Sequence, residues 1–232
     1  MPPITFAHRG GRAEAPENTL VAFARALGQG ARGLESDARL SADGEAVLIH
    51  GPYVRQGLRR LVVASTPATR LAEAGIPRLS DLYATLGGDF ELSLDLKDPR
   101  VAQPILDAAR QADAIGRLWL CSRDVDVLMG IRAVDPEVHL VHTMGRRRYG
   151  DTLEPHAAAL ARQGVAALNL AEREWSAGLV ALIHRFGLAA FAWDVQETRR
   201  LRALLEMGID AVYSDHVDRM VATVGEWTEG DG

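Results

Sequence analysis

Short apolar runs with β propensity recur along the chain, and segments with helical spacing separate them. In the segment 18–27, for example, Leu20, Phe23, Ala24 and Leu27 fall on one helix face. The eight β-type runs are 4–8, 33–40, 90–97, 117–122, 138–144, 165–171, 188–195 and 210–215. Further segments with the helical spacing are 100–112, 124–134, 152–163, 176–186 and 196–207. Strands that alternate with helices pair in parallel through crossover connections.

Eight such units predict an α/β fold, the eight-stranded parallel (β/α)₈ TIM barrel, whose typical length is about 250 residues. The chain has 232 residues, so we expect one barrel domain over 1–232. A further β run at 45–50 returns from the second strand. Proline and glycine punctuate 51–78, which predicts an irregular insertion there. Periodicity alone leaves a doubly wound open sheet as the alternative.

Charge and composition exclude several kinds of partner. The formal net charge is −5 and the pI is near 5.8, which argues against a nucleic-acid partner and against stable association with an anionic membrane. Cys121 is the only cysteine, which excludes an internal disulfide and a cysteine-based metal site. The N-terminal segment carries no secretory signal, and no apolar run reaches about 18 residues. We therefore expect a cytoplasmic protein with a small-molecule ligand, its oligomeric state left open.

Carboxylates gather where two neighbouring strands are predicted to end. Glu35 and Asp37 are two residues apart in a strand, so their side chains share a face, and Asp95 and Lys97 repeat this spacing on the next strand. Functional side chains of a parallel barrel come from the C-terminal ends of its strands. Three converging carboxylates repel one another unless a cation intervenes, and oxygen ligands favour Mg²⁺ or Ca²⁺. The alternative is a set of solvated residues at a sheet edge.

Two histidines and an arginine stand at other predicted strand ends. His8 and His50 each close a β run, and imidazoles with a pKa near neutrality are suited to general acid and base catalysis. The planar guanidinium of Arg9 suits phosphate oxygens, with an ion pair across the barrel mouth as the alternative. Together with the carboxylates, these residues indicate phosphate chemistry.

Four features near predicted strand or helix ends leave two interpretations each. His142 and Asn169 either reach the pocket or fill the barrel. Arg146–Arg148 either steer an anionic ligand or form a solvated loop. Asn18 either orients the site or caps the first helix.

Several motifs in a fixed order give the chain a family resemblance. These are "HRG" at 8–10, "PENTL" at 16–20, "GLESDARLSADGEAVLIH" at 33–50, "LDLK" at 94–97, "FAWDVQ" at 191–196 and "GIDAVYSD" at 208–215. From residue 6 to about 215 the chain resembles the glycerophosphodiester phosphodiesterase family. The resemblance implies a (β/α)₈ barrel that uses a divalent metal to hydrolyse glycerophosphodiesters to sn-glycerol 3-phosphate and an alcohol.

The same resemblance implies roles for eight residues. The metal ligands would be Glu35, Asp37 and Asp95, the acid and base His8 and His50, the phosphate ligands Arg9 and Lys97, and a pocket wall Trp193. Two positions depart from the family pattern: Gly51 follows the second histidine where aspartate is usual, and Asp95 stands where glutamate is common. A lysophospholipase D-like enzyme acting on lipid headgroups and a non-catalytic phosphodiester-binding barrel therefore remain as alternatives.

Overall fold

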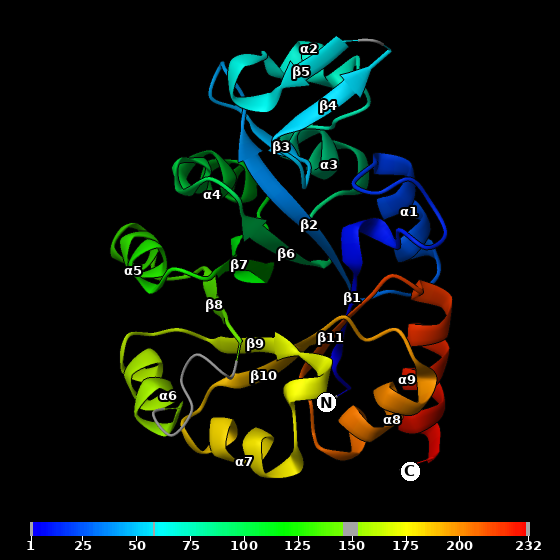
Figure 1. The fold of residues 1–232 in the computed structure, drawn as a ribbon, viewed down its shortest axis with the longest axis vertical. Helices are drawn as coiled ribbons and strands as arrows, with labels where there is room; N and C mark the ends of the chain where they lie inside the picture. The colour runs from blue at the N-terminus through cyan, green and yellow to red at the C-terminus, as the bar shows by residue number, and fades with distance from the viewer. Residues whose placement is uncertain (1, 58, 146–152, 231–232) are drawn as a thin grey trace.

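Eight parallel strands close into a barrel in the computed structural model, which describes residues 2–57, 59–145 and 153–230 (Figure 1). The strands are β1 (Ile4–Ala7), β2 (Gly33–Leu40), β6 (Glu91–Leu96), β7 (Leu118–Ser122), β8 (His139–Thr143), β9 (Ala167–Ala171), β10 (Ala189–Trp193) and β11 (Ala211–Ser214). β1 pairs with both β11 and β2, so the sheet has no open edge between its first and last strands. The predicted TIM barrel is confirmed, and the open-sheet alternative is wrong.

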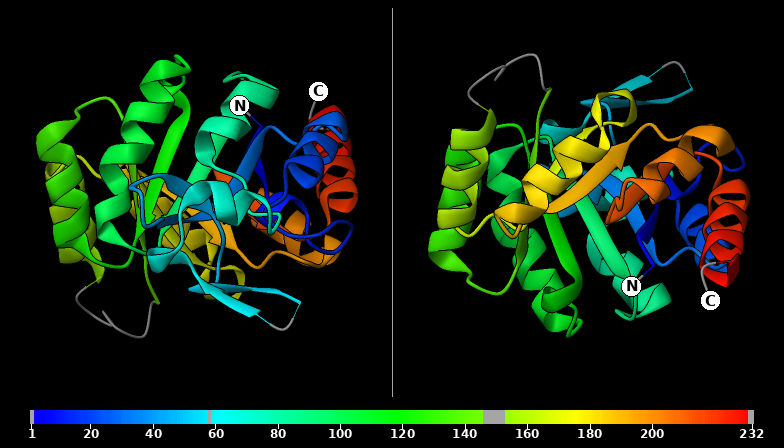
Figure 2. Two further views of the ribbon diagram at one scale, coloured as in Figure 1. Left: turned by 90° about the horizontal axis from the view of Figure 1, so that it is seen from above. Right: turned by 90° about the horizontal axis from the view of Figure 1, so that it is seen from below.

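Helices surround the barrel and bury their apolar faces against it (Figure 1). They are α1 (Leu20–Gly28), α3 (Leu79–Leu86), α4 (Ala102–Gln111), α5 (Val125–Val134), α6 (Leu153–Arg162), α7 (Ala177–Arg185), α8 (Thr198–Glu206) and α9 (Val217–Gly230). Thr19 caps α1, because its hydroxyl accepts the N–H of Ala22, so Asn18 is not the cap. Figure 2 shows α9 beside α1, and α9 also contacts β1, where the barrel closes.

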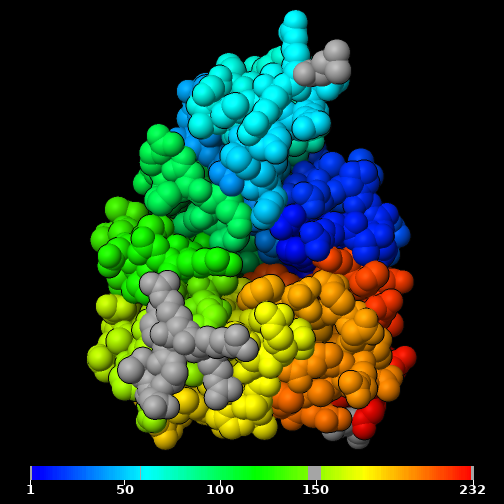
Figure 3. All heavy atoms as spheres, in the orientation of Figure 1, coloured from blue at the N-terminus to red at the C-terminus, as the bar shows by residue number. Residues whose placement is uncertain are grey.

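The segment 51–76, here called the excursion, is more regular than expected. Beyond β3 (Ala46–Leu48), which pairs antiparallel with β2, it forms an antiparallel hairpin of β4 (Tyr53–Gln56) and β5 (Arg59–Val62), then α2 (Ala68–Ala72). The glycines and prolines mark boundaries of these elements: Gly57 adopts φ +59° in the hairpin turn and Pro67 precedes α2. The small core beneath the excursion contains Val47, Ile49, Val63, Ala68 and Leu71. Figure 3 shows the excursion as a lobe above the barrel.

Aromatic rings fill the barrel on the side toward the N-terminal ends of its strands. The ring centroids of Phe6 and Tyr213 lie 4.8 Å apart, and those of Trp119 and Phe191 lie 5.1 Å apart. A Cβ atom at Gly33 would lie 2.6 Å from Phe6 Cδ1, so only glycine allows this ring to lie against β2. We call these four rings the aromatic floor; polar side chains occupy the barrel above it. Within the described residues, no helix combines the length and apolarity needed to cross a bilayer.

Candidate active site

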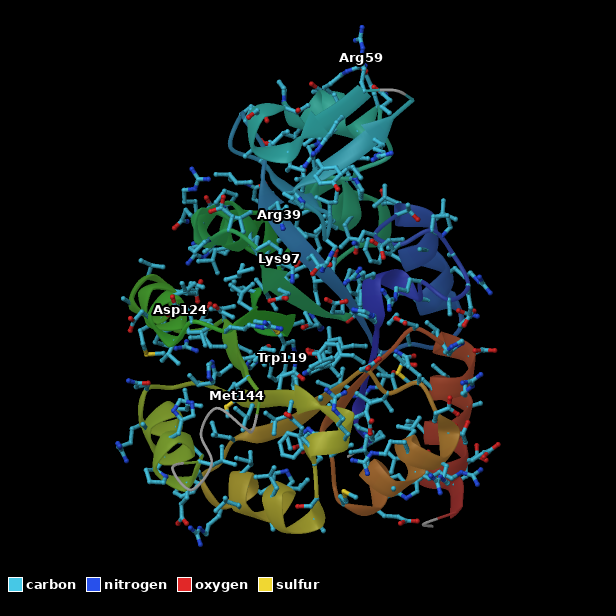
Figure 4. The ribbon with its side chains drawn as sticks, in the orientation of Figure 1. Arg39, Arg59, Lys97, Trp119, Asp124 and Met144 are labelled. Atoms are coloured by element: carbon cyan, nitrogen blue, oxygen red, sulfur yellow. The ribbon has the colours of Figure 1, made fainter. Side chains whose placement is uncertain are left out.

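The inward-facing side chains of the strands change from apolar to polar toward the C-terminal ends. They enclose a cavity of about 360 Å³ above the aromatic floor. All eight predicted site residues line it, namely His8, Arg9, Glu35, Asp37, His50, Asp95, Lys97 and Trp193. In Figure 4, Lys97 lies near the ends of β2 and β6, whereas Arg59 lies at the far end of the excursion. The predicted residues therefore come together; their individual roles stay predictions.

His8 is held from one side by a carboxylate on the neighbouring strand. Its Nδ1 lies 2.5 Å from Asp215 Oδ1, and Arg12 Nε donates to the other oxygen of Asp215 at 2.9 Å. Its Nε2 lies 3.7 Å from Glu35 Oε2. Burial by itself lowers the pKa of His8, but Glu35 and Asp215 outweigh burial and raise it. Burial likewise acts to raise the pKa of Asp215, yet His8 and Arg12 lower it. This geometry fixes the ring with Nε2 toward Glu35.

A left-handed backbone residue positions the first carboxylate. Arg9 adopts φ +51°, which is strained for a residue with a side chain, and its N–H donates to Glu35 Oε2 at 2.9 Å. Burial raises the pKa of Glu35 to about 7; His8 opposes this shift and Asp37 adds to it. Glu35 thus gains or loses a proton easily near neutral pH.

Lys97, the single lysine of the chain, lies between two carboxylates. Its Nζ is 3.0 Å from Asp37 Oδ1 and also bonds to Asp95 Oδ2. Burial acts to lower the pKa of Lys97, but Asp95 and Asp37 raise it above its ordinary value. Arg9 adds Nε at 3.3 Å from Asp37 Oδ2 and donates Nη1 to Glu17 at 3.0 Å. Arg9 therefore forms ion pairs in this structure, and its role as a phosphate ligand stays a prediction.

His50 reaches the cavity from the turn after β3 and is exposed. Arg39 fixes the backbone of His50, because its Nε and Nη2 both donate to the His50 carbonyl oxygen, at 3.1 and 2.9 Å. Burial lowers the pKa of His50; Asp37 opposes that effect, whereas Arg9 and Lys97 add to it. The neutral ring is favoured.

The donor chemistry of the cavity fits a hard divalent cation. Glu35, Asp37 and Asp95 line one wall, and Asp37 Oδ2 is buried with no hydrogen bond from the described residues, although Arg9 Nε lies 3.3 Å away as an ion-pair partner. Oxygen-only donors of this kind suit Mg²⁺ or Ca²⁺. In the part of the chain that the structure describes, no three acidic, histidine or cysteine groups are spaced to hold one ion. Lys97 bonds to two of the three carboxylates, and its ammonium carries the positive charge between them.

Several cavity residues had no assigned role in the sequence interpretation. Arg12, Arg123 and Asp194 line the cavity, and so does Asn169, whereas His142 bonds to the carbonyl of Ser122 outside the cavity. Asp194 and Asp215 stand at the ends of predicted β runs and Arg123 directly follows one, which is the signal that could have found them, whereas the pattern does not single out Arg12.

Two further sequence features have different outcomes. Asn18 does not cap the helix; its Oδ1 accepts the hydroxyl of Ser36, between Glu35 and Asp37 in β2, at 2.7 Å, and its orienting role stays a prediction. Arg146–Arg148 lie outside the described residues.

Comparisons with known proteins agree on one family. The family model described as "Glycerophosphoryl diester phosphodiesterase family" matches residues 8–219. A glycerophosphodiester phosphodiesterase of Caldanaerobacter subterraneus is 23% identical over 97% of this chain and 98% of its own.

Solved structures share the fold at low sequence identity. The structure of a glycerophosphodiester phosphodiesterase from Thermotoga maritima is similar with a TM-score of 0.83 and 22% identity, covering 95% of this chain and 97% of that one. An Oleispira antarctica phosphodiesterase, solved in complex with the product sn-glycerol-3-phosphate, has a TM-score of 0.81 and 24% identity, with coverage of 96% and 97%.

Proposed function

The chain belongs to the glycerophosphoryl diester phosphodiesterase family, and from this premise we propose that it hydrolyses glycerophosphodiesters to sn-glycerol 3-phosphate and an alcohol. The observation that carries the proposal is the His8–Asp215 pair at 2.5 Å, which faces Glu35 inside a cavity lined by further carboxylates and cations. A phosphodiester needs two proton transfers and neutralisation of its oxygens for this reaction, and the cavity contains groups suited to both.

The cations on the acidic wall are the proposed phosphate ligands. Arg9 and Lys97 both line the cavity and both engage Asp37, so they present positive charge at one place. Negative charge grows on the phosphoryl oxygens as the reaction proceeds, and fixed cations stabilise that charge in the transition state. The ion pairs with Asp37 hold the two side chains in place before the substrate binds.

The two histidines are the proposed acid and base. One imidazole takes the proton of the attacking oxygen as the new P–O bond forms, and the other gives a proton to the alcohol oxygen as the old P–O bond breaks. Asp215 holds Nδ1 of His8, so Nε2 is the atom of His8 that exchanges the proton. His50 stands on the excursion side of the cavity, fixed through its backbone by Arg39.

A divalent cation is proposed as cofactor. Glu35, Asp37 and Asp95 would hold it, and when bound it would neutralise charge on the phosphoryl oxygens. Lys97 would then have to give up one of its two carboxylate contacts. Asp95 is the better candidate to exchange partners, because its side chain is 32% exposed and that of Asp37 only 3%.

Release of glycerol 3-phosphate tests this proposal. A panel of glycerophosphodiesters is incubated with the protein in EDTA, and then with Mg²⁺, Ca²⁺ or Mn²⁺ restored. We expect metal-restored turnover, with most of it lost in His8→Ala and in His50→Ala. Near-normal turnover in either variant excludes that histidine as acid or base. If no glycerophosphodiester of the panel is hydrolysed but phosphodiester binding is retained, the result favours the non-catalytic binding barrel.

One observation supports a second candidate substrate, a lysolipid headgroup. Tyr53 and Val62 form a cross-strand pair on the hairpin and are 38% and 45% exposed. Arg60 stacks on the Tyr53 ring at 3.5 Å, and His50 lies only three residues before this pair. An apolar and basic lip beside the cavity suits an acyl chain next to a phosphate. Turnover of lysophosphatidylcholine that falls in Tyr53→Ser, while that of glycerophosphocholine does not, identifies this activity.

A further inference from the structure

The cavity has two unlike walls. Carboxylates and cations from β1, β2 and β6 form one wall. The strands opposite, β8, β9 and β10, present the neutral polar side chains of Thr143, Asn169 and Trp193, here called the neutral wall, and the charged Asp194 follows directly after β10. A phosphate held at the ionic wall leaves an organic arm of the substrate to face the neutral wall.

Two polar atoms of the neutral wall are buried without a protein partner. Within the described residues, Asn169 Oδ1 accepts no hydrogen bond and Trp193 Nε1 donates none, although Asn169 is only 6% exposed. The Asn169 amide is oriented by its other end, because Nδ2 donates to Thr143 Oγ1 at 3.4 Å. Buried polar atoms without partners are rare, since each costs the free energy of its lost hydration. Here the unsatisfied acceptor and donor lie on adjacent strands and line the same cavity.

From this arrangement we propose that Asn169 and Trp193 form a subsite for a hydroxyl group on the organic arm of the substrate. A hydroxyl both donates and accepts, so one group satisfies Asn169 Oδ1 and Trp193 Nε1 together. A quaternary ammonium arm has no O–H and satisfies neither atom. The subsite rests on the proposed function only in that the phosphate of the substrate lies at the ionic wall.

The subsite makes Asn169 a specificity-determining residue. A ligand that lacks the recognised hydroxyl leaves the amide and the indole unpaired, which corresponds to roughly 10- to 100-fold weaker binding. The size of the arm cannot explain this selectivity, because an arm that lacks one hydroxyl is smaller and still fits into the cavity. The wall therefore selects polyol arms over alkyl arms of the same length.

Binding of phosphate monoesters tests the subsite without requiring turnover. The probes are sn-glycerol 3-phosphate and two analogues that each lack one hydroxyl, 2-hydroxypropyl phosphate and 3-hydroxypropyl phosphate. Calorimetry gives Kd for each probe in the wild type, Asn169→Leu, Asn169→Asp and Thr143→Val. We expect the wild type to bind glycerol 3-phosphate at least tenfold more tightly than one analogue. That ratio should fall close to one in Asn169→Leu.

The other variants separate recognition from general damage to the wall. Asn169→Asp keeps an acceptor of the same shape, so it should retain more of the ratio than the leucine variant even if both probes bind less well. Thr143→Val removes the hydroxyl that orients the amide but leaves the amide itself, so we expect a ratio between those of the wild type and Asn169→Leu. A wild-type ratio near one for both analogues overturns the proposal. An unchanged ratio in Asn169→Leu overturns it too, as does a loss in Asn169→Asp that equals the loss in Asn169→Leu.

Failure of the proposed function gives a different result. Absence of diester turnover in every metal condition counts against the hydrolase, whereas the Kd ratios are measured on monoesters that are not hydrolysed. Discrimination that is lost in Asn169→Leu supports the subsite in either case.

Discussion

The partner of His8 illustrates what single residues contribute to this site. Asp215 is bonded both to His8 Nδ1 and to Arg12, and it directly follows the last strand of the barrel whereas His8 directly follows the first. No local pattern links two residues 207 positions apart. The sequence shows only that Asp215 ends a β run, and the pairing of β1 with β11 then brings the two side chains together.

We predict that Asp215→Asn lowers kcat by about 10- to 100-fold, because an oriented histidine loses its charged partner. The matched control is Asp210→Asn. Asp210 also binds a histidine, His184, at 2.7 Å, but this pair lies on the surface away from the cavity. Steady-state kinetics and melting temperatures are measured for both variants. Equal losses of kcat in the two variants contradict a special role for Asp215.

Lys97 gives a test of metal placement that does not depend on activity. Lys97→Met removes the ammonium from Asp37, whose side chain is 3% exposed, and should destabilise the metal-free protein by roughly 1–3 kcal/mol. A divalent ion held by the same carboxylates replaces the lost charge. Mg²⁺ or Ca²⁺ should therefore raise the melting temperature more in the variant than in the wild type. A smaller rise in the variant contradicts a cation site at these carboxylates.

At the scale of elements, the periodicity of the sequence located the eight barrel strands and six of the surrounding helices to within about two residues, because each buries one face against the same core. The helices α3 and α9 were not among the predicted segments. The excursion was predicted less well. Its hairpin is short and half exposed, so its apolar residues show no long period. Its proline and glycine residues were interpreted as interruptions, yet they delimit β4, β5 and α2.

One loop between elements makes the stability of the protein depend on pH. Asp135 ends α5 and is 1% exposed, and it accepts the N–H groups of Glu137 and Val138 at 2.8 and 3.0 Å. Burial acts to raise the pKa of Asp135, but these bonds and Arg110 outweigh it and lower the pKa below 3.8. The stabilisation is therefore complete above about pH 4 and is lost as the pH falls through the lower, folded-state pKa.

We predict that Asp135→Asn lowers the free energy of unfolding by about 1–3 kcal/mol at pH 7, with a smaller difference at pH 3. Urea denaturation at both pH values measures the two differences. Asp107→Asn is the control, because Asp107 lies 3.7 Å from the same Arg110 but is 53% exposed. A difference for Asp135→Asn that is as large at pH 3 as at pH 7 contradicts the assignment.

At the scale of the whole molecule, the aromatic floor joins strands from the beginning, middle and end of the chain. Phe191 is 1% exposed and neighbours Phe6, Trp119 and Tyr213. We predict that Phe191→Ala lowers the free energy of unfolding by about 3–5 kcal/mol, since it opens a cavity inside a closed barrel. Chemical denaturation measures this change. A loss below about 1 kcal/mol shows that the rings do not contribute to barrel stability as a unit.

The aromatic floor also determines by which route ligands enter and leave the barrel. With one end filled by rings, whatever enters the cavity leaves by the same mouth, and two products of a cleavage must depart in turn. The alcohol is uncharged at its cut end, whereas the phosphate monoester keeps its attraction to Arg9 and Lys97. The phosphate monoester should therefore be the second product to dissociate. When it accumulates, it should compete with the substrate for the empty cavity and so limit the rate of turnover.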